Sequence, residues 1–318
     1  MRILLTGSSG WLGRFLVPAL ARAGHEVTGL DIAPGANTDV LGSVADAELI
    51  EKIFAERRFE AVVHAGALHK PDIARYPAST FVEVNVSGTL NLLDAAVRHG
   101  AGRFVFTSTT SLMITRAIRA ETGDAAVWLD ETSGPLTPRN IYGVTKRSAE
   151  ELCRLWHDLY GLPVIVLRTA RFFPEDDDTV AVPTGENLKA NEFLNRRLTV
   201  EDCAAAHIVA LEAAPRVGWG IYVVSARPPF TPADAAGLKA DAAGLIAERF
   251  PDAPALYAAH GWVLPDSIGR VYDPSTIERD LGFRCQTDFA AVLAAMREGR
   301  DMPFIHDGSY LPPKELGR

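Results

Sequence analysis

The sequence predicts an α/β protein built on a doubly wound parallel sheet, with a small mixed C-terminal substrate-binding region. Three observations support this. Apolar strand-like runs alternate with helical patterns as far as residue 225, a glycine-spaced turn joins the first strand to the first helix, and prolines accumulate after residue 226. Strands that alternate with helices form parallel sheets with right-handed crossovers, so a single sheet covered by helices is expected.

Composition narrows the range of functions. A chain of 318 residues is long for one core, and 47% hydrophobic and 23% charged residues are typical of a globular protein. A formal net charge of −8 argues against nucleic-acid or anionic-membrane partners and favours a small-molecule substrate. No apolar run approaches membrane-spanning length, and the chain opens directly into a strand, so we expect a cytoplasmic protein. Cys153, Cys203 and Cys285 are too far apart to predict a disulfide framework or a metal knuckle.

The first strand, residues 2–6, runs into a turn with three regularly spaced glycines, and a helical pattern follows over residues 15–23. In a Rossmann-type sheet such glycines allow a tight turn, close approach of a pyrophosphate and close helix–strand packing. We therefore expect cofactor contacts at Gly7, Gly10, Trp11, Leu12 and Gly13. A glycine-rich turn without a ligand is the alternative. Pro18 lacks an amide hydrogen, which predicts a kink or an early end to the helix.

The second strand, residues 26–31, ends in Asp31. An acid about 20 residues after the glycine turn is where a dinucleotide fold binds the ribose hydroxyls of the adenosine. A carboxylate there repels a 2′-phosphate, and residues 32–37 contain no arginine to receive one. The pattern therefore favours NAD over NADP, although a solvated aspartate at a strand end would look the same.

The remaining pattern completes the sheet and sets the domain boundaries. We expect helices at 43–58, 81–99, 142–160 and 200–211, and strands at 61–65, 103–107, 163–168 and 221–225. Residues 169–197 show no clear periodicity and are interpreted as a lid or substrate loop. The predicted NAD-binding domain is thus residues 1–168 with 198–225 returning to it, and residues 169–197 and 226–318 form the substrate-binding cap.

Tyr142 and Lys146 open the third of these helices, and residues four apart share a helix face. An isolated tyrosine titrates near about 10, so a tyrosine base needs a neighbouring cation to work at neutral pH. A hydroxyl cluster, residues 107–111, ends the preceding strand at the edge where parallel sheets bind ligands. An ordinary surface tyrosine and lysine remain the alternative, because two residues alone are a weak signal.

Together these motifs resemble the extended short-chain dehydrogenase/reductase family, of the NAD-dependent epimerase/dehydratase type, over nearly the whole chain. The matching segments, in order, are Thr6 to Gly13, His64-Ala-Gly-Ala67, Asn85-Val-Ser-Gly-Thr89, Phe106 to Thr109, Tyr142-Gly-Val-Thr-Lys146, Leu167-Arg168, Val200-Glu-Asp202 and Asp273 to Phe283. The resemblance implies that Thr109 binds the reacting oxygen, Tyr142 transfers its proton, and Lys146 binds the nicotinamide ribose. Further cofactor contacts are implied at Ser43, Val44, Ala65, Gly66, Ala67, Asn85 and Thr107. The family commonly dimerises through two helices, here residues 81–99 and 146–160, so a homodimer is expected.

Departures from the family pattern bear on the reaction. Gly42-Ser43 stands where many members have Gly-Asp near the adenine. Thr109-Thr110 replaces the Asp-Glu pair with which the family's dehydratases move protons, which disfavours dehydration. Arg171-Phe172-Phe173-Pro174 occupies the place of a segment that usually contains asparagine, and the stretch that follows is short for binding a nucleotide diphosphate.

Candidate substrate contacts lie around this irregular segment. Arg171 and Arg197, with Arg196, could bind a carboxylate or phosphate, because guanidinium geometry suits both; pairing with residues 175–178 or Glu192 is equally consistent. His69, Thr109, Thr110 and Ser111 could line the same crevice. The acidic residues 176–178 have no accompanying ligand cluster and read as a solvated loop, so no metal is expected.

The sequence therefore predicts NAD-dependent hydride transfer at a secondary alcohol of a sugar or sugar-acid-like substrate, and an anionic substrate is one of the options. If NADH leaves, the enzyme is a dehydrogenase; if hydride returns to the other face, it is an epimerase. A nucleotide-sugar 4-epimerase that retains NAD is the main alternative. A non-catalytic NAD-binding regulator is the second, and the intact set of Thr109, Tyr142 and Lys146 argues against it.

Overall fold

The computed structural model describes residues 1–175, 182–183 and 185–305, and it has a parallel sheet of seven strands at its centre. The order of the strands is β3-β2-β1-β4-β5-β7-β8. Their bounds are β1 (Arg2–Thr6), β2 (Glu26–Asp31), β3 (Val40–Leu41), β4 (Ala61–His64), β5 (Phe104–Thr109), β7 (Val164–Thr169) and β8 (Trp219–Val224). Strands β2 and β3 lie on one side of β1, and the strands from β4 onwards lie on its other side. This order confirms the predicted doubly wound, Rossmann-type α/β fold.

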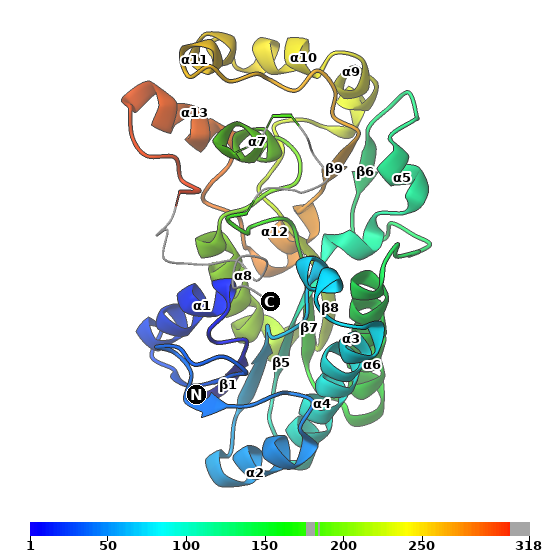
Figure 1. Ribbon diagram of the computed structural model, residues 1–318, viewed down its shortest axis with the longest axis vertical. Coiled ribbons are helices and arrows are strands. Elements are labelled where there is room, and N and C mark those ends of the chain that lie inside the picture. The colour runs from blue at the N-terminus through cyan, green and yellow to red at the C-terminus, as the bar shows by residue number, and fades with distance from the viewer. Residues whose placement is uncertain (176–181, 184, 306–318) are drawn as a thin grey trace.

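Helices cover both faces of this sheet, which occupies the lower half of Figure 1. Helices α1 (Trp11–Arg22) and α8 (Val200–Val217) pack against one face, and α2 (Ala47–Arg57), α4 (Gly88–Arg98) and α6 (Ile141–Tyr160) against the other. Each face has its own apolar core. The strands are buried on both sides, which explains why they read as continuous apolar runs instead of alternating ones.

The remaining elements lie mostly in the upper part of Figure 1. They are α5 (Arg116–Ala120), β6 (Val127–Leu129), α7 (Gly185–Glu192), α9 (Ala235–Ala240), α10 (Ala242–Arg249), α11 (Ala253–Ala259), β9 (Arg270–Tyr272), α12 (Ser275–Leu281) and α13 (Phe289–Glu298). β6 and β9 pair in parallel as a second, two-stranded sheet. A third apolar core, which includes Phe193, Phe230, Tyr257 and Phe289, holds most of these helices together.

Several predicted boundaries are wrong, each for a local reason. Helix α2 begins at Ala47 and not at residue 43, because the Asp46 carboxylate caps it by accepting from the Leu49 amide at 3.0 Å. Helix α1 runs through Pro18 to Arg22 without an early end, because Leu16 and Leu20 on either side are fully buried against the sheet. The predicted helix 81–99 is three pieces: α3 (Ala78–Val82), a π-helical turn (Glu83–Ser87) and α4.

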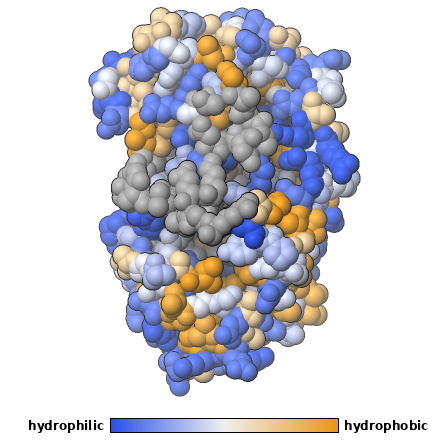
Figure 2. Space-filling view, in the orientation of Figure 1, coloured by the Kyte–Doolittle hydropathy of each residue, from blue (hydrophilic) through white to orange (hydrophobic). Residues whose placement is uncertain are grey.

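Two differences affect the part of the molecule near the ligand edge. Strand β5 continues to Thr109, two residues beyond the predicted end, because it pairs with β7 as far as Thr169. The region predicted to be irregular, residues 169–197, contains helix α7, whose inner face buries Leu188, Ala190 and Glu192. Figure 2 shows the surface in the same orientation, with hydrophobic areas in separate patches among hydrophilic ones.

Candidate active site

A cleft of about 930 Å³ lies at the carboxyl edge of the central sheet. Its walls come from the glycine turn, the ends of β2 and β5, the segments that follow β4 and β7, and the first turns of α6. These are the positions where parallel α/β sheets bind ligands, because loops diverge where the strand order reverses. Most of the cofactor-binding residues predicted from the sequence line this cleft.

The glycine turn has no room for side chains at two of its three glycines. Gly7 has a φ of +78°, and a Cβ there would lie 2.7 Å from the Gly66 amide nitrogen. A Cβ on Gly13 would lie 2.2 Å from the Gly7 carbonyl oxygen. Gly7, Gly10, Trp11 and Leu12 line the cleft at the first turn of α1, and the N-terminus of a helix favours an anion. The turn therefore fits the pyrophosphate of a dinucleotide.

Asp31 lies at the other end of the cleft from Tyr142 and is held in a fixed orientation. Its Oδ2 accepts from the Ser9 amide and its Oδ1 from the Ala33 amide, both at 2.9 Å. A carboxylate has about four acceptor sites, so two remain for the ribose hydroxyls of a dinucleotide. Ser43 and Val44 line the adjoining wall.

We expect the Asp31→Asn variant to lose most of its discrimination between NAD and NADP, by at least about tenfold in the ratio of their dissociation constants. Asparagine keeps the size of the side chain and an acceptor for one of the two amides, and it removes the charge that repels a 2′-phosphate. Titration of both cofactors measures the ratio. Glu26→Gln, at the exposed opposite end of β2, is the control; an unchanged ratio in Asp31→Asn would count against the assignment.

Asn85 does not line the cleft, contrary to the prediction of a direct cofactor contact. Its amide nitrogen donates to the Leu68 carbonyl at 3.0 Å and to Thr145 Oγ1 at 3.1 Å, and its oxygen accepts from the Leu68 amide at 2.8 Å. The hydrogen-bonding groups of the side chain therefore connect the segment after β4 to α6. Ala65, Gly66 and Ala67, which precede that segment, do line the cleft.

Tyr142, Thr109 and Lys146 meet where β5 ends against α6. Asn140 caps that helix by accepting from the Gly143 amide at 2.9 Å, which fixes Tyr142 in its first turn. All three side chains are buried, with 9% of Tyr142, 7% of Thr109 and 3% of Lys146 exposed. Tyr142, Lys146 and Thr107 line the cleft, whereas Thr109 lies behind its wall and reaches Tyr142 by a side-chain hydrogen bond.

The contacts that orient the Lys146 side chain come from strand β5 and not from Tyr142. Its Nζ donates to the Thr107 carbonyl at 2.7 Å and lies 4.5 Å from the centre of the Phe106 ring. Burial lowers the pKa of Lys146 to about 7, while the nearby Cys153 and Glu150 oppose that change. Ammonium and amine are thus both populated at neutral pH, and a bound ligand can decide between them.

Burial raises the pKa of Tyr142 to about 12, even though the Thr109 hydrogen bond lowers it. The sequence predicted that Lys146 would favour the phenolate, but here desolvation outweighs any such effect. Tyr142 is therefore a protonated phenol at neutral pH, and further positive charge in the cleft is needed to make it a base. Oxidised nicotinamide carries such a charge.

A buried ion pair braces the same strand from behind. Arg168 on β7 pairs with Glu150 on α6 through Nη2–Oε2 and Nε–Oε1 contacts of 2.7 and 3.1 Å. Ser108 Oγ donates to the same Glu150 Oε1 at 2.6 Å. Ser108 stands between Thr107, which accepts from Lys146, and Thr109, so the pair fixes the stretch of backbone that carries both contacts.

Three histidines surround this region, and two of them, His64 and His207, are buried. His64 lies between Thr6 and Thr89, His207 Nε2 lies 2.7 Å from Thr107 Oγ1, and the His69 ring faces the cleft. Burial lowers the pKa of His69 and of His207 to about 4 and that of His64 well below its usual range. All three are neutral in the folded protein at neutral pH.

These histidines predict a loss of stability in acid. In the unfolded chain a histidine becomes protonated near about pH 6.5, whereas in the folded protein it stays neutral to a lower pH. The free energy of unfolding is therefore greatest above about pH 6.5 and falls as the pH decreases. Between about pH 7 and pH 5 we expect the fully buried His207 alone to cost on the order of 2 kcal/mol. Urea unfolding at both pH values measures this. His207→Gln should show a shallower decrease than the wild type, and equal decreases would contradict the assignment.

The predicted substrate contacts divide into two groups. The His69 ring lines the cleft, with its centre 6.1 Å from that of Tyr142 and 5.3 Å from that of Phe173. Thr110 and Ser111 do not line it. Thr110 Oγ1 donates to the Thr169 carbonyl at 3.3 Å, and Ser111 is exposed on the turn after β5. Their predicted role is therefore corrected: the backbone turns away from the cleft after Thr109.

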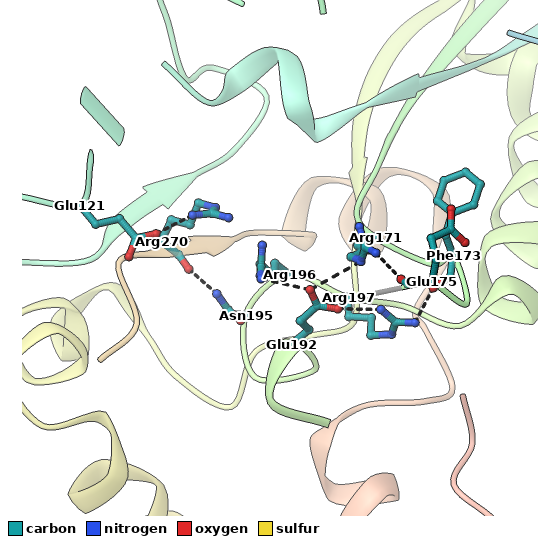
Figure 3. A network of polar contacts seen from close by, with 9 residues as sticks. All are labelled: Glu121, Arg171, Phe173, Glu175, Glu192, Asn195, Arg196, Arg197 and Arg270. Atoms are coloured by element: carbon teal, nitrogen blue, oxygen red, sulfur yellow. Dashed lines mark hydrogen bonds and ion pairs between the residues drawn. The ribbon is translucent and has the colours of Figure 1, made fainter. Parts of the chain in front are cut away.

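The prediction that Arg171 and Arg197 bind a substrate anion is also contradicted. Both converge with Arg196 on the buried carboxylate of Glu192 from α7, as Figure 3 shows. Arg197 Nη1 lies 2.6 Å from Glu192 Oε2, and its Nη2 donates to the Phe173 carbonyl at 2.8 Å. Arg171 donates to the Glu175 carbonyl. Neither arginine lines the cleft, so the alternative of internal pairing is the correct one.

This arginine cluster, Arg171, Arg196 and Arg197 around Glu192, still acts on the cleft. It holds the backbone of Phe173, whose ring, stacked on Phe172 at 4.5 Å, closes the cleft beside His69. Trp11 Nε1 donates to the Phe172 carbonyl at 3.1 Å and ties the same segment to the glycine turn. Phe172 and Phe173 line the cleft, but they were not predicted as ligand contacts because apolar residues carry no motif.

Residues 176–178, considered as a metal site from the sequence, lie outside the described residues. Elsewhere in the described ranges, no three histidine, cysteine, aspartate or glutamate side chains are grouped to hold a metal ion. Within the same ranges, no helix is both long and apolar enough to cross a membrane.

A doubly wound sheet with a pyrophosphate-type turn, a ribose-binding acid and a buried tyrosine–lysine pair defines a dinucleotide-dependent enzyme of the short-chain dehydrogenase/reductase class. A family model for the NAD dependent epimerase/dehydratase family matches residues 3–186. The chain belongs to this family, whose members depend on NAD.

Known relatives cover several reactions. The chain is 30% identical over 336 aligned positions to dTDP-glucose 4,6-dehydratase of Streptomyces antibioticus, a match that covers 92% of this chain and 90% of that protein. It is 34% identical over 181 positions to L-arabinose 1-dehydrogenase (NAD(P)(+)) of Haloferax volcanii, over 55% of this chain and 69% of that one. Among solved structures, the dTDP-glucose 4,6-dehydratase DesIV of Streptomyces venezuelae, with NAD and TYD bound, is 25% identical, with a TM-score of 0.63 over 93% of this chain and 96% of that chain.

Proposed function

We propose that this enzyme transfers hydride between NAD and a secondary alcohol of a sugar or sugar acid, and that it acts as a dehydrogenase. The observation that carries the proposal is the buried Tyr142, hydrogen-bonded to Thr109 and one helical turn from Lys146, at the edge of a cleft that fits a dinucleotide. A group that can transfer a proton (Tyr142), a hydrogen-bonding group for the substrate oxygen (Thr109) and a cation (Lys146) thus lie together.

The cofactor-binding half of the cleft would hold NAD through the glycine turn and Asp31, with Lys146 at the nicotinamide ribose. Bound NAD supplies the hydride acceptor. Thr109 holds the oxygen of the alcohol, and Tyr142 as phenolate accepts the hydroxyl proton while the hydride leaves the same carbon. Lys146 stays protonated in that complex, because a nearby phenolate favours the ammonium form.

Two features favour a small substrate that is oxidised and released. The Phe172–Phe173 pair lines the cleft, in the segment where the family resemblance implies an asparagine, and Arg197 is buried in a close ion pair with Glu192. Arg197 is therefore not available to bind a nucleotide diphosphate, and Arg171 donates to the Glu175 carbonyl. The second candidate, a nucleotide-sugar 4-epimerase that retains NAD, is supported by 30% identity over 53% of this chain to UDP-glucose 4-epimerase of Halalkalibacterium halodurans.

Dehydration and a purely regulatory role are less well supported. The residue after Thr109 is a threonine whose hydroxyl donates to the Thr169 carbonyl, so this position provides no carboxylate to move a proton during loss of water. A regulator that only binds NAD would not need Thr109, Tyr142 and Lys146 to converge.

The proposal also covers the location of the protein, its oligomeric state and its domains. We propose a cytoplasmic homodimer that associates through α4 and α6, because α6 exposes Leu155, Leu159 and Tyr160. We also propose that residues 1–168 with 198–225 form the NAD-binding domain, and residues 169–197 and 226–318 the cap. The separate apolar core of the upper helices supports that division.

The function is tested by incubating the enzyme with NAD and a panel of sugars, uronic acids, hydroxy acids and nucleotide sugars. NADH release and product stereochemistry are followed together. Released NADH with one substrate class supports the dehydrogenase. An inverted product without released NADH supports the epimerase. Tight NAD binding without turnover of any compound would contradict both enzymatic assignments.

A further inference from the structure

We propose that Arg75 is the anion-binding residue of this enzyme and that it binds the carboxylate of a sugar acid at the Tyr142 end of the cleft. The inference rests on the proposed function and specifies its substrate class. It replaces the role that the sequence assigned to Arg171 and Arg197.

At the Tyr142 end of the cleft, one wall consists of residues that are not among the proposed cofactor contacts. His69, Asp72, Arg75 and Tyr76 follow β4 and line the cleft, and the edge of the His69 ring contacts the Phe173 ring, with 5.3 Å between the ring centres. His69 connects this wall to the reaction site, because its ring lies 6.1 Å from the Tyr142 ring and its amide donates to Asp72 Oδ2 at 2.8 Å. A molecule that presents an alcohol to Tyr142 therefore also meets this wall.

The charges that line the described cleft leave one cation for a substrate. Lys146 is 3% exposed and bound to the Thr107 carbonyl, and Arg14 lies on α1 next to the glycine turn, at the pyrophosphate end. Arg75 lies at the Tyr142 end. Its guanidinium approaches Asp72 Oδ1 no closer than 3.7 Å and lies 5.6 Å from the Tyr76 ring centre, so its forked donors remain available.

Asp72 determines which anion fits. It is 5% exposed, and burial chiefly raises its pKa, against the effects of the His69 amide and Arg75. The same carboxylate adds to the burial that raises the pKa of Tyr142, which places it within electrostatic reach of the reacting group. A carboxylate that binds the Arg75 guanidinium in bidentate fashion brings one negative charge near Asp72, whereas a phosphate dianion brings two and meets stronger repulsion.

The test uses full-length enzyme with NAD and matched substrate pairs: glucuronate with glucose, galacturonate with galactose, and the 6-phosphates of both sugars. For Arg75→Gln we expect KM for the uronates to rise about 10- to 100-fold, as for loss of a charge-assisted bond, with kcat nearly unchanged. KM for the neutral sugars should not change. Arg75→Lys should restore part of the affinity, and Arg300→Gln, exposed far along the chain in the cap, is the control.

Each outcome supports or overturns the proposed role of Arg75 or the proposed substrate class. Turnover of uronates with unchanged KM in Arg75→Gln would overturn the role of Arg75. Turnover of neutral sugars, sugar phosphates or nucleotide sugars instead of uronates would overturn the substrate class while leaving the proposed hydride transfer intact. Absence of turnover of every compound by an enzyme that still binds NAD would overturn the inference together with the proposed function.

Discussion

Replacement of Tyr142 with phenylalanine is expected to lower kcat by about 10²- to 10⁴-fold, the usual contribution of a positioned acid or base. The affinity for NAD should stay within about twofold, because Lys146 keeps its bond to the Thr107 carbonyl and the glycine turn is untouched. Phenylalanine retains the buried ring against Leu68 and Phe81, so folding should be preserved.

Two measurements sharpen this result. Tyr160→Phe, at the exposed end of the same helix, should have wild-type activity. In the wild type, the oxidation rate should increase with pH, because burial raises the pKa of Tyr142 to about 12 and only the deprotonated form accepts the substrate proton. A Tyr142→Phe enzyme with wild-type kcat, or a wild-type rate that falls as pH rises from neutral, would refute the assigned base.

Replacement of Glu150 with glutamine is expected to lower the free energy of unfolding by about 3–5 kcal/mol, since it leaves a buried arginine charge unpaired. Arg168 is 3% exposed and Glu150 4%, so water cannot replace the lost partner. Because Ser108 Oγ also donates to Glu150, the backbone between Thr107 and Thr109 should loosen, and kcat should fall in the fraction that remains folded.

Glu151→Gln is the matched control, because it makes the same chemical change at the next residue of α6, which is exposed. Its effect should stay within about 0.5 kcal/mol. Chemical denaturation of both variants measures the difference. Similar values for the two would mean that the buried pair does not hold the strand and helix together.

The sheet was predictable because its signals are local. Strands buried on both faces read as apolar runs, and the glycines at 7 and 13 are required by backbone contacts that a Cβ would violate. Element boundaries were less predictable. The cap by Asp46 and the pairing of β5 to Thr109 depend on which side chain or strand is nearby, and α7 gains its stability from burial against the upper core.

The proximity of Tyr142 and Lys146, the pair that we propose to be catalytic, was predictable for the same reason, because both lie on one helix at a spacing of four residues. The substrate wall was not. The ion pairs of Arg171 and Arg197 are made with Glu192, and nothing in the sequence indicates that three arginines share that carboxylate. Arg75 gave no signal either, because only the path of the chain after β4 turns it towards Tyr142.

The central claim is that hydride moves from a carbinol carbon to NAD while Tyr142 takes the hydroxyl proton. It is tested most directly with a substrate from the panel that carries deuterium on that carbon. The account predicts that the deuterium appears in the nicotinamide of the NADH formed and that Tyr142→Phe abolishes this transfer. Product formed by the wild type with its deuterium lost to water would contradict the account.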